Sequence, residues 1–236
     1  MTPAALFATL EATWPAAARL PCGPFLLRQG LGGGQRVSAA TAEGDWTLAD
    51  IAAAEAAMRD LGQMPLMLIR AGEDALDAAL AAQGWQIHDP VLAYAAPVAA
   101  LMAPVSGMAV FAHWPPLAIT ADLWAEGGIG PERLTVMQRA PGPKTALLAR
   151  NADKPCGAAF VALHDDHAML HALEVRPALR RAGSGRRLLQ AAANWAAAQG
   201  ATDLSLAVTE ANAPARRLYE ALGMAPITRY HYRRKA

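Results

Sequence analysis

Hydrophobic positions in the last third of the chain change spacing in a regular order. Residues 170–175 form a mainly apolar, extended run that ends before Pro177, and this pattern predicts a strand. Apolar residues then recur at helical spacing over 186–199, which predicts a helix with one buried face. A second strand is predicted at 203–208 and a second helix at 213–222. The order strand, helix, strand, helix is typical of an α/β protein.

A glycine-rich turn lies between the first strand and the first helix. Gly183 and Gly185 permit a close backbone approach, and Arg180, Arg181 and Arg186 add positive charge. The free N–H groups of a helix N-terminus bind phosphate groups well. No lysine follows Gly185, as a P-loop requires, and the third glycine of a dinucleotide fingerprint is absent. The turn therefore predicts a site for a different phosphate-bearing cofactor.

The pattern Arg180-x-x-Gly183-x-Gly185 resembles the acyl-CoA pyrophosphate loop of the GNAT superfamily of N-acetyltransferases. Asn212, Tyr219 and the segment 222–224 follow at the spacing of that family, so the resemblance covers roughly residues 145–236. It implies an α/β (α+β) fold with a mixed, twisted sheet flanked by helices. It also implies acetyl-CoA as co-substrate and an amine as acceptor.

The resemblance also implies roles for individual residues. The strand before the loop would present backbone groups to the pantetheine arm and to the thioester oxygen, and the loop would hold the pyrophosphate. Two residues of the second helix region would contact CoA. The cofactor-binding residues expected on this basis are Leu173, Val175, Arg180, Arg181, Ala182, Gly183, Ser184, Gly185, Arg186, Asn212 and Arg216.

Tyr219 is the expected acid for the departing thiolate, because it matches the helix tyrosine of the family. By itself it could equally be a core aromatic of an amphipathic helix. Asn212, seven residues earlier, favours the functional interpretation, although Asn212 could also cap the helix that begins at Ala213.

His171 and Glu174 are the candidate bases, since some family members carry a His or Glu on this strand. Side chains alternate along a strand, so these two are expected on opposite faces unless a bulge intervenes. Only one would then face the acceptor, and the ordinary pKa of histidine favours His171. His164 and His167 flank two aspartates, which is more typical of a solvated turn than of a metal site. No metal is predicted.

A similar order of elements occurs earlier, over residues 50–94. Gly62 and Gly200 are 138 residues apart, and so are Tyr94 and Tyr232. Two tandem GNAT-like modules are therefore predicted, over residues 1–100 and 101–236, with only the second complete; chance similarity of two αβαβ stretches is the alternative. The segment 42–47, which corresponds to the loop, has one glycine and two carboxylates. The first module is thus expected to be degenerate and to wall the acceptor site.

Composition limits the possible partners. The chain is 54% hydrophobic with a net charge of +1, which gives no electrostatic basis for binding nucleic acid or anionic membrane. Its two cysteines are far apart, and it has no convincing signal peptide or apolar span, so a cytoplasmic protein is expected. The apolar content is compatible with a homodimer or with a contact between modules.

These features predict an acetyl-CoA-dependent N-acetyltransferase that transfers the acetyl group directly to an amine of a small molecule or a protein. A non-catalytic CoA-binding or scaffolding module is the alternative. A longer-chain acyl donor is a third interpretation, and no sequence feature marks a widened acyl pocket.

Overall fold

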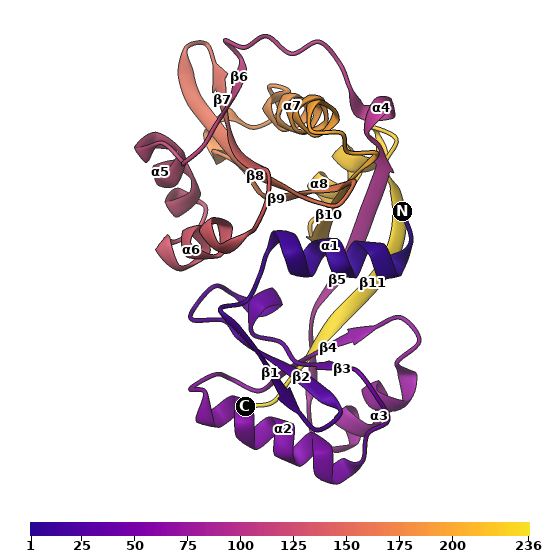
Figure 1. Ribbon diagram of the computed structural model, residues 1–236. Coiled ribbons are helices and arrows are strands. Elements are labelled where there is room, and N and C mark those ends of the chain that lie inside the picture. The colour runs from indigo at the N-terminus through magenta and orange to yellow at the C-terminus, as the bar shows by residue number, and fades with distance from the viewer.

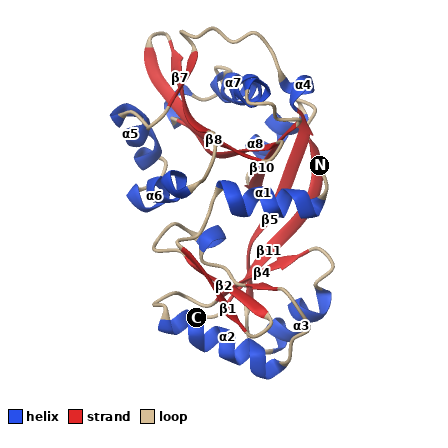
Figure 2. Ribbon diagram, viewed as in Figure 1, coloured by secondary structure: helices blue, strands red, loops and turns tan.

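The strands of the computed structural model, which describes residues 1–236, form one large and one small sheet (Figures 1 and 2). The elements up to the middle of the chain are α1 (Pro3–Thr13), β1 (Ala18–Cys22), β2 (Phe25–Gln29), a 3₁₀ turn (Gln35–Val37), β3 (Thr41–Ala42), α2 (Leu48–Asp60), β4 (Leu66–Arg70), α3 (Asp74–Ala82) and β5 (Gln86–Pro97). The remaining elements are α4 (Val98–Leu101), β6 (Val110–His113), α5 (Ala118–Glu126), α6 (Pro131–Arg139), β7 (Lys144–Asn151), β8 (Lys154–His164), β9 (His167–Val175), a 3₁₀ turn (Pro177–Leu179), α7 (Ser184–Ala198), β10 (Asp203–Thr209), α8 (Ala213–Glu220) and β11 (Ala225–Arg234).

The large sheet has eight strands in the order β4-β11-β5-β10-β9-β8-β7-β6. All neighbouring pairs are antiparallel except β9 and β10, which are parallel. The small sheet has the order β1-β2-β3, and an isolated parallel bridge between Ala40 and Met67 links it to β4. The fold is therefore a mixed α/β structure with a mixed sheet, as the sequence predicted. Its strands continue almost without interruption across the molecule.

The two long strands β5 and β11 run side by side from one lobe of the molecule to the other (Figure 1). Each lies between two strands of the opposite half, because β11 separates β4 from β5 and β5 separates β11 from β10. The pairs Arg70–Tyr230 and Val208–Leu92 are related by the same offset of 138 residues that relates Tyr94 to Tyr232. The tandem repeat remains a prediction, and this matching register supports it.

The predicted boundary near residue 100 falls directly after β5. This strand belongs to the first predicted module, yet both of its sheet neighbours, β10 and β11, belong to the second. The division into 1–100 and 101–236 remains a proposal. Because the sheet is shared, a protein cut after residue 100 would lack the central strand β5 in its second part.

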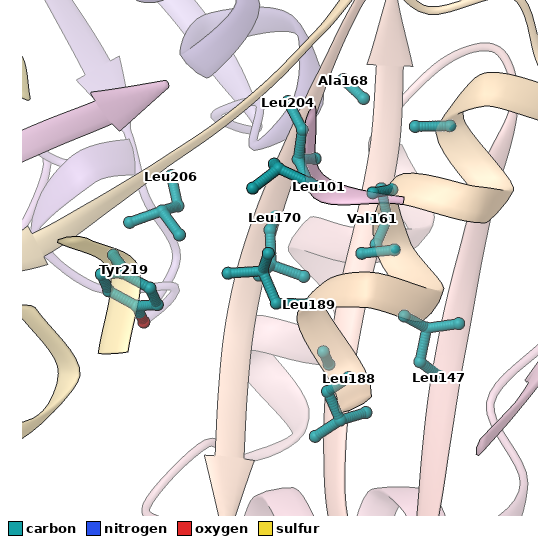
Figure 3. Close-up of a cluster of buried hydrophobic side chains, with 14 of the residues drawn as sticks. Leu101, Leu147, Val161, Ala168, Leu170, Leu188, Leu189, Leu204, Leu206 and Tyr219 are labelled. Carbon is teal, nitrogen blue, oxygen red and sulfur yellow. The ribbon is translucent and has the colours of Figure 1, made fainter. Parts of the chain in front are cut away.

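Hydrophobic residues pack on both faces of strands β7 to β9. One core contains the apolar face of α7, with Leu188 and Leu189 against Val161 and Leu170, and Tyr219 lies at its border (Figure 3). On the other face, Phe160 packs with α5, α6 and the end of α1, where Trp14 contacts its ring at a centroid distance of 6.1 Å. Alternate residues of β8 thus point into different cores, as the period of a strand requires. The helices of the protein all lack the length and hydropathy needed to cross a membrane.

Candidate active site

Strands β9 and β10 separate partway along their length. Their parallel pairing runs from His167–Asp203 to Leu170–Leu206 and then stops, although β9 continues to Val175. Beyond this point the backbone groups of β9 that do not face β8 open toward the gap between the strands. Free peptide groups of this kind can bind an extended amide chain by adding hydrogen bonds to the strand edge.

A β-bulge lies where the strands separate. Phe160 pairs with His171 and Ala158 pairs with Glu174, so β9 contains one more residue than β8 over this stretch, and Ala172 has a φ of 50°. The carbonyl of Ala172 accepts a hydrogen bond from Trp124 Nε1 at 2.8 Å. The extra residue resets the alternation of side chains. His171 and Glu174 therefore share one face of the sheet, and the expectation of opposite faces is wrong because of this bulge.

The predicted phosphate loop precedes α7 directly. Gly183 is the N-cap residue with a φ of 79°, in the left-handed region that favours glycine. None of the backbone N–H groups of residues 181–186 donates a hydrogen bond to any group of the protein. These donors, together with the positive end of the helix, form a cradle for an anion.

A cavity of about 470 Å³ joins the loop to the separated strands. It brings together most of the residues predicted from the sequence, and it adds five residues of α8 and its end. The predicted residues that line it are Leu173, Glu174, Val175, Arg180, Arg181, Gly183, Ser184, Gly185, Arg186, Asn212 and Tyr219. The prediction omitted five residues that also line the cavity: Pro214, Ala215, Arg217, Leu218 and Ala221.

Three predicted residues, His171, Ala182 and Arg216, do not line this cavity. Ala182 lies in the loop and its carbonyl accepts a hydrogen bond from Arg187 at 2.9 Å. Arg216 points away, toward the Tyr94 hydroxyl at 3.4 Å and the Glu210 carbonyl at 3.2 Å. Arg217 lines the cavity instead. The sequence did hold a signal, because positions 214, 217, 218 and 221 follow one face of a helix.

Tyr219 is buried, with 6% of its surface exposed, and its hydroxyl makes no hydrogen bond in the protein. Its ring packs on Tyr94 at a centroid distance of 6.0 Å. Burial, with a smaller contribution from Glu174, raises the pKa of Tyr219 to about 12, although Arg36 opposes this shift. The phenol is therefore protonated at neutral pH and free to donate a proton into the cavity.

Asn212 caps α8, with its Oδ1 accepting from the Ala215 N–H at 3.2 Å. Its side-chain amide nitrogen makes no hydrogen bond within the protein. The capping role therefore leaves two donors available at the cavity wall.

The two candidate bases differ in access. Glu174 lines the cavity, and its Oε1 lies 3.0 Å from Arg180 Nη2. His171 is 2% exposed and stacks on Trp14 at a centroid distance of 5.0 Å. Burial and the charge of Arg36 lower the pKa of His171 well below its usual range. The cavity thus holds one of the two candidates.

The tautomer of His171 follows from its hydrogen bonds. Thr13 donates its single hydroxyl proton to the carbonyl of Thr9 at 2.6 Å, so it can only accept from His171 Nε2, which lies 2.8 Å away. The proton of the neutral ring is then on Nε2. The other ring nitrogen, Nδ1, is buried and has no partner.

The corresponding turn of the N-terminal half is closed by its own side chains. Thr47 caps α2, and the Thr47 N–H donates to Asp50 Oδ2 at 2.8 Å while the Asp50 N–H donates to Thr47 Oγ1 at 3.3 Å. A carboxylate therefore occupies the place that an anionic ligand would take. Under the predicted repeat, the position that corresponds to Tyr219 is Leu80 or its neighbour Ala81, and Leu80 is buried in the core.

Comparisons with known proteins agree with this geometry. Residues 114–224 match the model of the acetyltransferase (GNAT) family. The chain is 28% identical over 239 residues to the uncharacterized N-acetyltransferase YobR of Bacillus subtilis (strain 168), covering 95% of each chain. Among solved structures it resembles a GCN5-related N-acetyltransferase from Kribbella flavida, with 20% identity, a TM-score of 0.74 and coverage of 100% of this chain and 96% of that one. It also resembles a tandem GNAT protein from the clavulanic acid biosynthesis pathway, with 13% identity, a TM-score of 0.62 and coverage of 98% and 87%.

Proposed function

We propose that this chain, whose residues 114–224 match the model of the acetyltransferase (GNAT) family, transfers the acetyl group of acetyl-CoA directly to an amine. The observation that carries the proposal is the row of unused N–H donors at 181–186, which opens into the same cavity as the separated strands and Tyr219. Acetyl-CoA would supply the activated acetyl thioester. The residues of the chain would bind it, orient it and move two protons.

The loop would bind the pyrophosphate. The N–H groups of 181–186 offer hydrogen bonds to its oxygens, and Arg181 and Arg186 carry charges that no carboxylate of the protein pairs. Arg217 on α8 adds a third guanidinium without a carboxylate partner to the same cavity. An anion of this size and charge fits the donors that the protein leaves unused.

The separated part of β9 would bind the pantetheine arm and the thioester. Leu173 and Val175 line the cavity on this strand. A backbone N–H aimed at the thioester oxygen stabilises the negative charge that develops there as the amine attacks. The carbonyl of Val175 already accepts a hydrogen bond from Arg180 Nε at 2.9 Å, which holds the end of the strand against the loop.

Tyr219 would protonate the departing sulfur. As the new C–N bond forms and the C–S bond breaks, the sulfur receives the phenol proton and the amine loses a proton to a base. A thiolate is a weaker base than a phenolate of pKa near 12, so Tyr219 would first donate a hydrogen bond to the charge that develops on the sulfur. Its proton would move to the sulfur only as the proton released by the amine restores the phenol.

We propose Glu174 as the base. It lines the cavity with Tyr219, whereas His171 is enclosed and its Nε2 proton is held by Thr13. The carboxylate of Glu174 is paired with Arg180, which also lies at the phosphate loop. A bound pyrophosphate gives Arg180 a second anionic partner, and this would release Glu174 toward the amine.

Calorimetric titration with acetyl-CoA tests the cofactor assignment. Gly183→Asp places a carboxylate in the cradle and is expected to weaken binding roughly tenfold or more. Gly183→Ala is the matched control, because both variants impose the same backbone strain at a φ of 79° and an added Cβ meets no atom within 4 Å. Wild-type protein that does not bind acetyl-CoA at millimolar concentration would contradict the proposal. Binding without thiol release from any amine would favour the alternative, a non-catalytic CoA-binding module.

A further inference from the structure

A second cavity, of about 360 Å³, lies at the separated strands and is lined by Ala172 of β9 and Thr209 of β10. Ala172 is followed in β9 by Leu173, which lines the larger cavity beside α7 and α8. The other walls of the second cavity come from the C-terminal end of α1, the start of α6, the Gly33–Arg36 segment and the strands β5 and β11. Its volume is in the range of small-molecule sites. The two cavities therefore approach the bulge from different directions, which suits two substrates that react there.

Two arginines line the second cavity without a carboxylate partner. Arg133 makes no side-chain hydrogen bond or ion pair in the protein. Arg36 donates a hydrogen bond to the Ala207 carbonyl at 3.0 Å, lies beside the hydroxyls of Tyr230 and Tyr232, and forms no ion pair. Asp89 is the single carboxylate of the cavity, and it accepts from Gln35 at 3.0 Å. The cavity thus has an excess of positive charge and unused guanidinium donors.

Most arginines of the neighbouring cavity have carboxylate partners. The cavity of about 550 Å³ between α1 and the small sheet is also lined by Arg36, and its other arginines, Arg19, Arg28 and Arg70, are paired with carboxylates. Arg28 bonds to Glu11 at 2.6 Å, and Arg70 bonds to Glu43 at 2.7 Å. Arg36 therefore borders both cavities, whereas Arg133 lines only the second one and has no carboxylate partner.

Close packing of the glycine segment brings the two arginines together. A Cβ on Gly33 would lie 2.6 Å from the Val136 side chain of α6, so only glycine permits this approach. A Cβ on Gly34 would lie 3.3 Å from the Arg133 guanidinium, and Gly34 has a φ of 96°. A glycine run such as that at residues 30–34 is by itself typical of a flexible turn. The structure shows a segment that packs against α6 and carries Arg36 to the separated strands.

We infer that the acceptor is a small amine that also carries an anionic group, a carboxylate or a phosphate, bound by Arg36 and Arg133. This inference rests on the proposed function and adds the substrate class. With its anionic end between the guanidiniums, such a molecule would direct its amine toward Ala172 and the bulge of β9. A polycationic amine would meet two positive charges instead.

Acceptor selectivity tests the inference. We would measure thiol release from acetyl-CoA with β-alanine, O-phosphoethanolamine, propylamine and putrescine. At least one anionic amine is expected to exceed propylamine in kcat/KM by roughly 10- to 100-fold, the usual contribution of hydrogen bonds to a charged group. The first two acceptors distinguish a carboxylate site from a phosphate site. Equal rates with all four, or a preference for putrescine, would overturn the inference and leave the acetyltransferase proposal intact.

Arginine variants test whether Arg133 causes the preference for an anionic amine. Arg133→Met is expected to abolish the preference for the anionic amine with little change for propylamine, and Arg133→Lys should restore part of it. Arg229→Met is the control, because Arg229 is also an arginine without an ion pair but lines neither cavity. Equal losses with all acceptors in Arg133→Met would show a structural role and contradict the inference.

Direct binding gives a readout that does not depend on turnover. Protein saturated with CoA is titrated with the preferred anionic amine, and binding is expected for the wild type and not for Arg133→Met. If the wild-type protein fails to bind CoA at all, the proposed function fails first. If it binds CoA but not the amine, the acceptor class is wrong.

Discussion

Tyr219 and His171 are both buried, and burial shifts their pKa values in opposite directions. For Tyr219 it raises the pKa to about 12, and for His171 it lowers the pKa well below the usual range. In each case the neutral form is favoured, because a charge is costly in a medium of low dielectric constant. Neutral tyrosine keeps a proton that it can donate, while the proton of neutral His171 is committed to Thr13.

Tyr219→Phe tests the proposed acid. We expect kcat to fall roughly 100-fold or more, as when a general acid is removed, with the affinity for acetyl-CoA nearly unchanged. Because the pKa of Tyr219 is about 12, its ionisation should cause no loss of activity below about pH 11. Stopped-flow thiol release and calorimetry would measure both effects.

At the scale of elements, the turns that precede α7 and α2 differ in whether their backbone N–H groups are free. The N–H groups before α7 are free, while those at the start of α2 are bonded within the Thr47–Asp50 capping box. The helix dipole is similar in both, so the local side chains decide which helix can receive an anion. This contrast supports the view that only the C-terminal half binds CoA.

Thr47→Ala tests the structural role of the capping box. Loss of an N-cap should lower Tm by roughly 2–4 °C in a chain of this size. The affinity for acetyl-CoA should not change, because α2 packs on β1 and β2 at the opposite end of the molecule from α7 (Figure 1). Thermal unfolding and calorimetry on the same preparation would check this. A loss of one acetyl-CoA site in Thr47→Ala would show that the N-terminal half does bind the cofactor.

At the scale of the whole molecule, β11 connects the two halves. It pairs with β4 and β5, and Arg233 near its end forms two hydrogen bonds with Asp77 of α3, at 2.7 and 3.0 Å. His231 of the same strand lies 2.7 Å from Asp77. The C-terminal strand is thereby attached to a helix of the N-terminal half.

This attachment should make stability depend on pH. Hydrogen bonding to Arg233, and then to His231, holds the pKa of Asp77 below its ordinary value of 3.8. A carboxylate with a lower pKa in the folded state stabilises the protein above the unfolded-state pKa, and this contribution is lost as pH falls through the folded pKa. Asp77→Asn should therefore lower the urea midpoint at pH 7, with the difference from wild type shrinking below about pH 3.8.

Asp166→Asn is the control, since the pKa of Asp166 is also lowered but its partner Thr202 lies within the C-terminal half. A difference between Asp77→Asn and wild type that is constant down to pH 2 would contradict this assignment.

The sequence by itself determined the local features of this protein. The glycine pair, the arginines around it and the helix periodicity depend on neighbouring residues, so the loop at 180–187 and the elements β9, α7, β10 and α8 could be predicted. The helix period could also have selected Arg217 in place of Arg216. These features follow from backbone conformation and spacing along a single element.

Only the tertiary structure decided what depends on contacts between distant segments. The bulge at Ala172 appears as an extra residue relative to β8, and this placed His171 and Glu174 on one face. The exchange of β5 and β11 between halves depends on pairing across more than 100 residues, for which a local pattern carries no signal. Arg36 and Arg133 line the same cavity because Gly33 packs against Val136. Such contacts are selected by the packing of the whole chain, which no local stretch of residues specifies.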